Sequence, residues 1–170
     1  MKILITGVAG TGKSTISKEL KKRGINAIDF SDIPDLCSWR DKTTKKEVKY
    51  LPPIEDRKWF DSNERICDLN KLKNILDKYK DIIIAGIASG NQTEYLKFFD
   101  KVLLLQCNPE TFINRMNNRV PIFGKTDAER NFVVDWQKEL DPILLSYGAI
   151  PINTEGTIDP VMEKIMTEIS

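Results

Sequence analysis

Short runs of hydrophobic residues alternate along the chain with longer stretches in which hydrophobic positions recur at helical spacing. The runs are mostly continuous, which is typical of strands covered on both faces of a parallel sheet. They predict strands at residues 2–6, 26–29, 81–86, 101–106 and 149–153. The amphipathic stretches predict helices at residues 13–23, 69–79, 92–99, 109–116, 127–147 and 158–169. This alternation is typical of an α/β fold, and Pro142 is expected to kink or divide the longest helix.

Two stretches interrupt the alternation, residues 31–62 after the second strand and residues 117–126 after the fourth. Within the first, residues 36–40 and 47–51 flank a polar run and predict a hairpin that projects from the sheet. The chain has 170 residues, which suits one domain, and shows no internal repeat or linker. We therefore expect a single domain, residues 1–170, with two insertions.

The overall composition narrows the range of partners. The formal net charge is +1, which gives no general attraction to nucleic acid or to an anionic membrane and favours a small-molecule partner. No hydrophobic run is long enough to cross a membrane and no secretory leader is recognisable, so we expect a cytoplasmic protein, either a monomer or a homodimer. Histidine is absent, and the three cysteines lack the spacing of a zinc site, so any general base must be a carboxylate or another residue.

The most specific motif is the segment GVAGTGKST at residues 7–15, which matches GxxxxGK[ST] between a predicted strand and a predicted helix. Its glycines allow a tight turn in which backbone N–H groups point at phosphate oxygens, beside the positive end of the helix. Lys13 should reach the β- and γ-phosphates, Ser14 should ligate Mg²⁺, and Thr15 should contact the α-phosphate. The residues expected to bind the nucleotide here are Gly7, Ala9, Gly10, Thr11, Gly12, Lys13, Ser14 and Thr15. The motif predicts binding of ATP or a related triphosphate with Mg²⁺.

Two carboxylates, Asp29 and Asp32, follow the second strand at the edge of the sheet where ligands bind in open α/β folds. A carboxylate there could orient an attacking hydroxyl, accept its proton or hold Mg²⁺. We expect Asp29 to be the catalytic and metal-associated acid and Asp32 to contact the acceptor. The alternative is that either residue caps the next turn.

Three further residues are candidates for binding the group that accepts the phosphoryl. Trp39 and Arg40 lie in the predicted hairpin, where an aromatic face and a guanidinium could hold a base, sugar or anion. Ordinary packing of Trp39 and a solvated Arg40 are the alternatives. Asn91 follows a glycine-rich turn and is either a helix N-cap or an acceptor ligand.

The stretch after the fourth strand is rich in positive charge, with Arg115, Arg119, Lys125 and Arg130. Cations brought over a triphosphate stabilise the charge on the transferring group. We expect Arg119 and then Arg115 to be catalytic and Lys125 to bind the nucleotide. If the helix continues, Arg115 and Arg119 share one face, and the alternative is that these cations only stabilise the end of a helix.

The third strand lacks the acid that often follows such a strand in P-loop proteins. Its isoleucines run into Ala85 and Gly86, and Asp81 lies at the opposite end. The third strand therefore supplies no second protein ligand for Mg²⁺, and the sequence does not identify which residue does.

The order of the predicted elements resembles the P-loop nucleoside and nucleotide kinases, which include adenylate kinase-like and shikimate kinase-like proteins. Closer still is the resemblance to small bacterial ATP-binding proteins identified as AAA-family ATPases, carried here by residues 37–41, 86–91, 115–119, 123–125 and 152–154.

The resemblance implies a three-layer fold with a five-stranded parallel sheet in the order 2-3-1-4-5. It also implies that residues 31–62 bind the acceptor and that residues 117–126 form a lid over ATP. Gly86 would admit the acceptor against the backbone, and Asn153 and Thr154 would border the adenine.

These observations together predict an ATP- and Mg²⁺-dependent phosphotransferase for a nucleotide, nucleoside or similar small metabolite. The absence of an NKxD sequence favours ATP over GTP. One alternative is a nucleotide-hydrolysing switch. The other is a kinase for nucleic-acid ends that uses the basic run at residues 40–49, although such runs usually face water.

Overall fold

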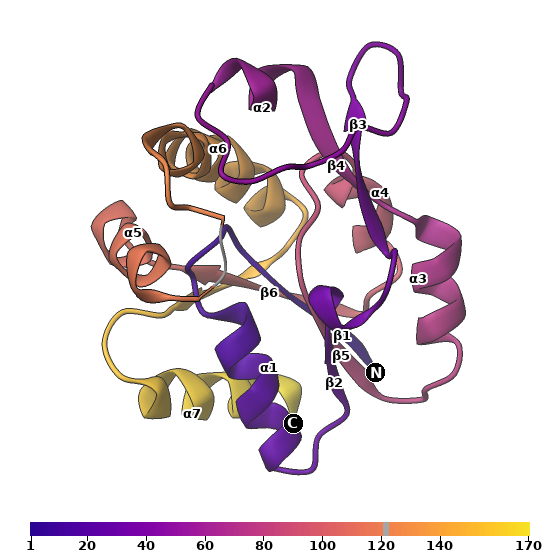
Figure 1. The fold of residues 1–170 in the computed structure, drawn as a ribbon. Helices are drawn as coiled ribbons and strands as arrows, with labels where there is room; N and C mark the ends of the chain where they lie inside the picture. Colours follow the sequence, from indigo (N-terminus) through magenta and orange to yellow (C-terminus); the bar gives the residue numbers. More distant parts are fainter. Residues whose placement is uncertain (121–122) are drawn as a thin grey trace.

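The structure is a computed structural model that describes residues 1–120 and 123–170. Its centre is a five-stranded parallel sheet with the order β2-β5-β1-β6-β7 (Figure 1). The strands are β1 (Lys2–Thr6), β2 (Ala27–Asp29), β5 (Ile82–Ala85), β6 (Lys101–Gln106) and β7 (Ile150–Asn153). Counted within this sheet alone, the order is 2-3-1-4-5, as predicted.

Helices cover both faces of the sheet and complete three layers. Leu4 of β1 joins one core cluster, whereas Ile3 and Ile5 join the other, because successive side chains of a strand point to opposite faces. One layer consists of α1 (Lys13–Lys22) and α7 (Ile158–Ile169). The other consists of α3 (Leu69–Leu76), α4 (Gln92–Leu96), α5 (Pro109–Asn118) and α6 (Asp127–Ser146). None of the helices in the described residues is long and apolar enough to cross a membrane.

The long helix α6 runs unbroken past Pro142, so the expectation that this proline divides the helix is wrong. A proline removes one N–H from the helical ladder. Leu140 and Leu144, on either side of it, are buried in the core, and this packing holds the two halves together. Thr126 and Glu129 form a capping box at the start of the helix.

The insertion after β2 is larger than predicted and is paired differently. Its main strands are β3 (Cys37–Asp41) and β4 (Asn63–Cys67), which form an antiparallel ladder, with α2 (Lys58–Ser62) leading into β4 (Figure 1). The expected partner, residues 47–51, contributes a bridge between Arg40 and Glu47. Pro52 and Pro53 follow directly and cannot donate to a ladder. The predicted hairpin therefore forms in part, with Val48 N also donating to the Trp39 carbonyl oxygen at 2.9 Å, but the main partner of β3 is β4, which was not predicted, and the insertion extends to residue 67.

Candidate active site

The P-loop lies between β1 and α1 in the conformation that its glycines require. Gly7, Gly10 and Gly12 have φ values of 137°, 85° and 105°, in the left-handed region that favours glycine. A Cβ atom on Gly10 would lie 2.6 Å from the Phe112 carbonyl oxygen of α5. Ser14 and Thr15 are exposed in the first turn of α1, which contains no acidic residue. The helix end therefore presents backbone N–H groups without a competing negative charge.

Lys13 bends back over this loop and is electrostatically strained. Its Nζ donates to the carbonyl oxygens of Gly7 at 2.6 Å and Val8 at 2.8 Å. Burial lowers the pKa of Lys13 to about 7; the charge of Asp29 opposes this shift, and the charges of Arg119 and Arg65 add to it. The charges of one carboxylate and two guanidinium groups thus influence the pKa of the P-loop lysine.

Asp29 both caps a turn and faces the site. Its Oδ1 accepts hydrogen bonds from the Ser31 backbone N at 2.9 Å and the Ser31 hydroxyl at 2.7 Å. Its Oδ2 is buried and has no hydrogen-bond partner among residues 1–120 and 123–170. A buried carboxylate oxygen without a partner is costly, so this atom is available to a ligand.

Asp32, by contrast, lies at the surface in an ion pair with Lys21 of α1, with 2.8 Å between Oδ2 and Nζ. The hydrogen bond from Lys21 lowers the pKa of Asp32. The chain turns after β2, which directs the two carboxylates to different surroundings, and a contact of Asp32 with an acceptor stays a prediction.

The two arginines expected to be catalytic both reach the neighbourhood of the P-loop. Arg115 Nη1 lies 3.5 Å from the Gly10 carbonyl oxygen, and its Nη2 donates to the Thr154 carbonyl oxygen at 2.6 Å. Arg119 is the C-cap of α5 in an extended conformation, so the two do not share a helix face as expected. Its Nη2 donates to the Phe123 carbonyl oxygen at 3.1 Å, and its Nε is buried and has no partner in the part of the chain that the structure describes.

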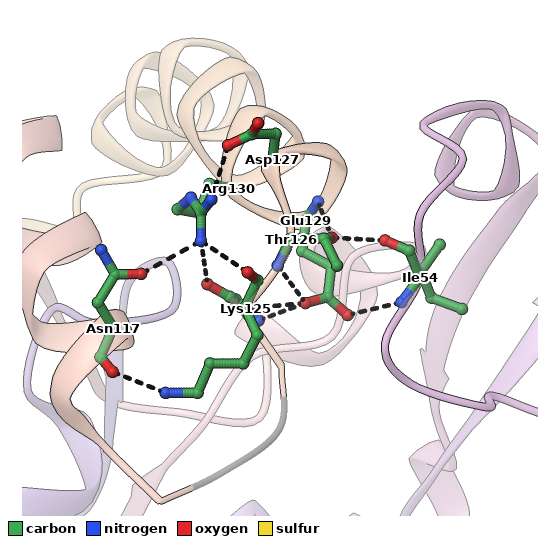
Figure 2. Close-up of polar contacts among 8 residues, drawn as sticks. Ile54, Asn117, Lys125, Thr126, Asp127, Glu129 and Arg130 are labelled. Carbon is green, nitrogen blue, oxygen red and sulfur yellow. Dashed lines mark hydrogen bonds and ion pairs between the residues drawn. The ribbon is translucent and has the colours of Figure 1, made fainter.

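Lys125 closes the end of α5 in this structure (Figure 2). Its Nζ donates to the carbonyl oxygens of Met116 at 2.9 Å, Asn117 at 2.8 Å and Arg119 at 2.7 Å. A role at a phosphate would require these bonds to break. The expected lid, residues 117–126, includes residues 121–122, which lie outside the described residues.

Arg65 of β4 is a candidate site residue that the sequence analysis missed. It is the cross-strand neighbour of Trp39, and its charge influences the pKa of Lys13. Arg40 lies on the opposite face of β3, is exposed, and donates from Nε to the Ser38 hydroxyl at 3.3 Å. The cation that the hairpin brings toward the P-loop is therefore Arg65. Recognising Arg65 would have required predicting β4 as the partner of β3.

Trp39 is partly buried in a cluster of aromatic rings within the insertion. Its ring stacks on Tyr50, with 5.6 Å between centroids, and meets Trp59 edge-on at 4.8 Å. Packing therefore accounts for most of its surface, as the alternative interpretation expected. Contact with an acceptor stays a prediction.

The glycine-rich turn after β5 is shaped by packing. A Cβ atom on Gly86 would lie 2.2 Å from Cγ of Phe30, so a ring occupies the space expected for an acceptor. Asn91 precedes α4 but makes no side-chain cap. Its amide accepts from the Cys67 N at 2.9 Å and donates to the Cys67 carbonyl oxygen at 2.8 Å. Asn91 therefore holds the strand β4 and Gly86 makes room for the ring of Phe30, while an acceptor contact of either residue stays a prediction.

The loop after β7, expected to border the adenine, uses its side chains to hold its own shape. Thr154 is buried and donates from its hydroxyl to the Gln106 carbonyl oxygen at 3.2 Å. Asn153 Oδ1 accepts from the Glu155 N at 2.9 Å. Any contact with a base would therefore be made mainly through the backbone of this loop.

Within residues 1–120 and 123–170, no three His, Cys, Asp or Glu side chains gather as a ready-made metal site. The donors present are the Ser14 hydroxyl and the unpaired Oδ2 of Asp29. Hard oxygen donors in this small number fit Mg²⁺, which retains several waters and takes further ligands from phosphates.

Several named proteins resemble this chain in sequence over most of its length. A UPF0200 protein of Pyrococcus abyssi is 29% identical over 155 residues, which are 83% of this chain and 75% of the relative. A protein of Methanocaldococcus jannaschii named "Putative adenylate kinase" is 34% identical over 124 residues, covering 70% of this chain and 59% of the relative. A shikimate kinase of Francisella tularensis is 24% identical over 172 residues, covering 97% and 92%.

Solved structures share the fold at low identity. The deoxyadenosine kinase from M. mycoides with bound dATP aligns with a TM-score of 0.57 and 19% identity, covering 99% of this chain and 98% of that one. The shikimate kinase from Bacteroides thetaiotaomicron aligns with a TM-score of 0.59 and 16% identity, covering 99% and 97%. The model of a protein family described as "AAA domain" matches residues 3–133 of this chain. With its P-loop, its parallel sheet and this match, the chain belongs to the AAA domain family and has the P-loop kinase-like fold.

Proposed function

We propose that the protein is an ATP- and Mg²⁺-dependent phosphotransferase that acts on a small molecule. The observation that carries this proposal is the P-loop with Lys13 bent over it, beside a buried Asp29 Oδ2 that has no hydrogen-bond partner among the described residues and whose charge acts on Lys13. A domain that only binds a nucleotide needs no chemistry beyond the P-loop itself. The unpaired oxygen of Asp29 and the guanidinium of Arg65 from the insertion can each bind a group of a second molecule beside the triphosphate.

Each group has a role in transfer. The loop N–H groups, the start of α1 and Lys13 would bind the phosphates. Ser14 Oγ and Asp29 are the residues that would hold Mg²⁺, which would neutralise charge on the transferring group. Asp29 Oδ2 orients the acceptor hydroxyl and accepts its proton. Arg119 stabilises the charge that spreads over the transferring phosphoryl oxygens.

The acceptor is narrowed by Arg65. A partly buried guanidinium opposite an aromatic ring favours an acceptor that carries a phosphate or carboxylate. The relatives named for adenylate, shikimate and deoxyadenosine phosphorylation support a hydroxylated or nucleotide-type acceptor in general and leave its identity open.

The test is ADP release from Mg²⁺-ATP in the presence of panels of nucleosides, nucleoside monophosphates and hydroxylated carboxylic acids. We expect one class to raise ADP release well above the rate without acceptor, and Lys13→Ala to abolish the increase. Binding of Mg²⁺-ATP with an acceptor-independent rate across all panels would contradict the proposal and favour a nucleotide-hydrolysing switch.

A further inference from the structure

A single buried carboxylate joins the insertion to the segment that follows α5. Glu129 is fully buried in the first turn of α6. Its Oε1 accepts from the Tyr50 hydroxyl at 3.1 Å and the Ile54 backbone N at 3.2 Å. Its Oε2 accepts from the backbone N of Gly124 at 2.8 Å and Lys125 at 2.9 Å. Each oxygen thus serves one of two segments about 75 residues apart in sequence (Figure 2).

This arrangement exceeds what a helix cap requires. In a capping box the glutamate serves the N-cap backbone, here Thr126, whose N lies 3.4 Å from Oε2. The Thr126 hydroxyl additionally donates to the Ile54 carbonyl oxygen, which forms a second link between the segments (Figure 2). Among the described residues, no side-chain cation hydrogen-bonds to the Glu129 carboxylate, so these neutral donors provide its hydrogen bonds, while the charge of Arg119 interacts with it without a hydrogen bond.

Both ends of the link lead to residues of the proposed active site. On the insertion side, Tyr50 stacks on Trp39, which lies opposite Arg65. On the other side, the segment of Gly124 and Lys125 continues from Phe123, whose carbonyl oxygen holds Arg119. Arg130 adds stiffness, because its Nη1 donates to the carbonyl oxygens of Gly124 at 3.2 Å and Lys125 at 2.9 Å.

We propose that Glu129 is a positioning residue that couples residues 50–54, on the acceptor side of the site, to residues 123–126, which hold Arg119. Because each carboxylate oxygen is committed to one segment, a displacement of one segment costs hydrogen bonds unless the other follows. A ligand that moves or orders one segment therefore also moves or orders the other, and the position of Arg119 changes together with the acceptor side of the site. The inference rests on the proposed function for what the two sides bind, but the coupling itself is a property of these contacts.

Amide hydrogen exchange on the full chain, with and without a non-hydrolysable Mg²⁺-ATP analogue, tests the coupling without an acceptor. In the wild type, the analogue should slow exchange at residues 123–126 and also at residues 50–54. Tyr50→Phe removes one hydroxyl and keeps the stacked ring, and it should reduce the protection transmitted to residues 50–54 by about fivefold, as expected for one hydrogen bond. Glu129→Gln should abolish the transmission, because its NH2 group takes the place of one of the two accepting oxygens and the remaining oxygen can accept from only one of the two segments.

Tyr147→Phe, at a largely exposed tyrosine, is the matched control and should behave like the wild type. Melting curves identify any variant that has lost its fold, and Tyr50→Phe keeps the test valid if Glu129→Gln does not fold. The inference is overturned if the analogue leaves exchange at residues 50–54 unaffected in the wild type. It is also overturned if the analogue protects these residues as strongly in both variants as in the wild type. Neither result depends on phosphoryl transfer, so a failed acceptor screen and a failed coupling test remain distinguishable.

Discussion

The protonation of Lys13 should make nucleotide binding depend on pH. Burial holds its pKa at about 7 in the free protein, whereas phosphate oxygens favour the charged ammonium. Above pH 7 the free lysine is largely neutral, so binding must take up a proton, and the affinity for Mg²⁺-ATP should fall as pH rises, by up to about tenfold per pH unit. Calorimetric titration at pH 8 in two buffers of different ionisation enthalpy measures this uptake directly. Identical heats in both buffers would contradict the depressed pKa.

The two acids after β2 should separate in a pair of matched variants. Asp29→Asn retains a side chain that can cap Ser31 but loses the charge and basicity of Oδ2, so transfer to the acceptor should fall by about a hundredfold or more. The free energy of unfolding should change by about 1 kcal/mol or less. Asp32→Asn breaks an exposed ion pair with Lys21 and should leave the turnover number unchanged. A large loss of turnover in Asp32→Asn alone would reverse the assignment.

Gly86 should be intolerant of any side chain. An alanine Cβ would lie 2.2 Å from Cγ of Phe30, and relief requires a backbone shift, so Gly86→Ala should destabilise the protein by about 1–3 kcal/mol. Gly148→Ala is the comparison, because its Cβ meets nothing within 4 Å and the only cost arises from a φ of +83°. Urea unfolding of the two variants gives the difference. Equal stability of Gly86→Ala and the wild type would show that the ring of Phe30 moves freely.

At the level of elements, the β3–β4 ladder decides which arginine can act on the acceptor. Arg65 lies opposite Trp39 on the face toward Lys13, whereas Arg40 is exposed on the other face. Arg65→Gln should raise KM for the acceptor about tenfold or more, through loss of a charge-assisted hydrogen bond to its anion. Arg40→Gln should leave steady-state kinetics unchanged. Equal effects of the two substitutions would show that the hairpin acts only through its net charge.

The elements also show why some features are predictable from sequence and others are not. The central strands and the P-loop depend on local signals, namely continuous apolar runs and a fixed spacing of glycines and lysine, and both were predicted. Strand β4 has the sequence NERIC, whose strand conformation comes from pairing with β3 and from the Asn91 and Ser89 side chains that bind its outward N–H groups. Those partners are distant in sequence, so no local pattern indicates them.

Glu129 shows the same limit. In the sequence it is one more charged residue near a helix start, and its burial depends on donors at residues 50–54. Arg65 became recognisable only with β4.

At the scale of the whole molecule, the insertion and the sheet share one core. Leu36 and Cys67 of the insertion lie in the same buried cluster as Leu4 and Leu104 of the sheet. Phe60 of α2 stacks on Phe132 of α6 with 4.5 Å between ring centroids. We therefore predict a single cooperative unfolding transition with equal calorimetric and van't Hoff enthalpies. A separate low-temperature transition of the insertion would contradict this.

The neighbouring rings of Trp39 and Trp59 give the insertion an optical signature of its own. Their centroids are 4.8 Å apart and their planes meet at 65°, so the electronic transitions of the two indoles interact. Coupled chromophores at an inclined angle produce paired circular-dichroism bands of opposite sign, whose size depends on that angle. Trp136, the third tryptophan, stacks on Phe132 in α6, so it belongs to a different element. Rearrangement of the acceptor side can therefore be followed by spectroscopy in the unlabelled protein.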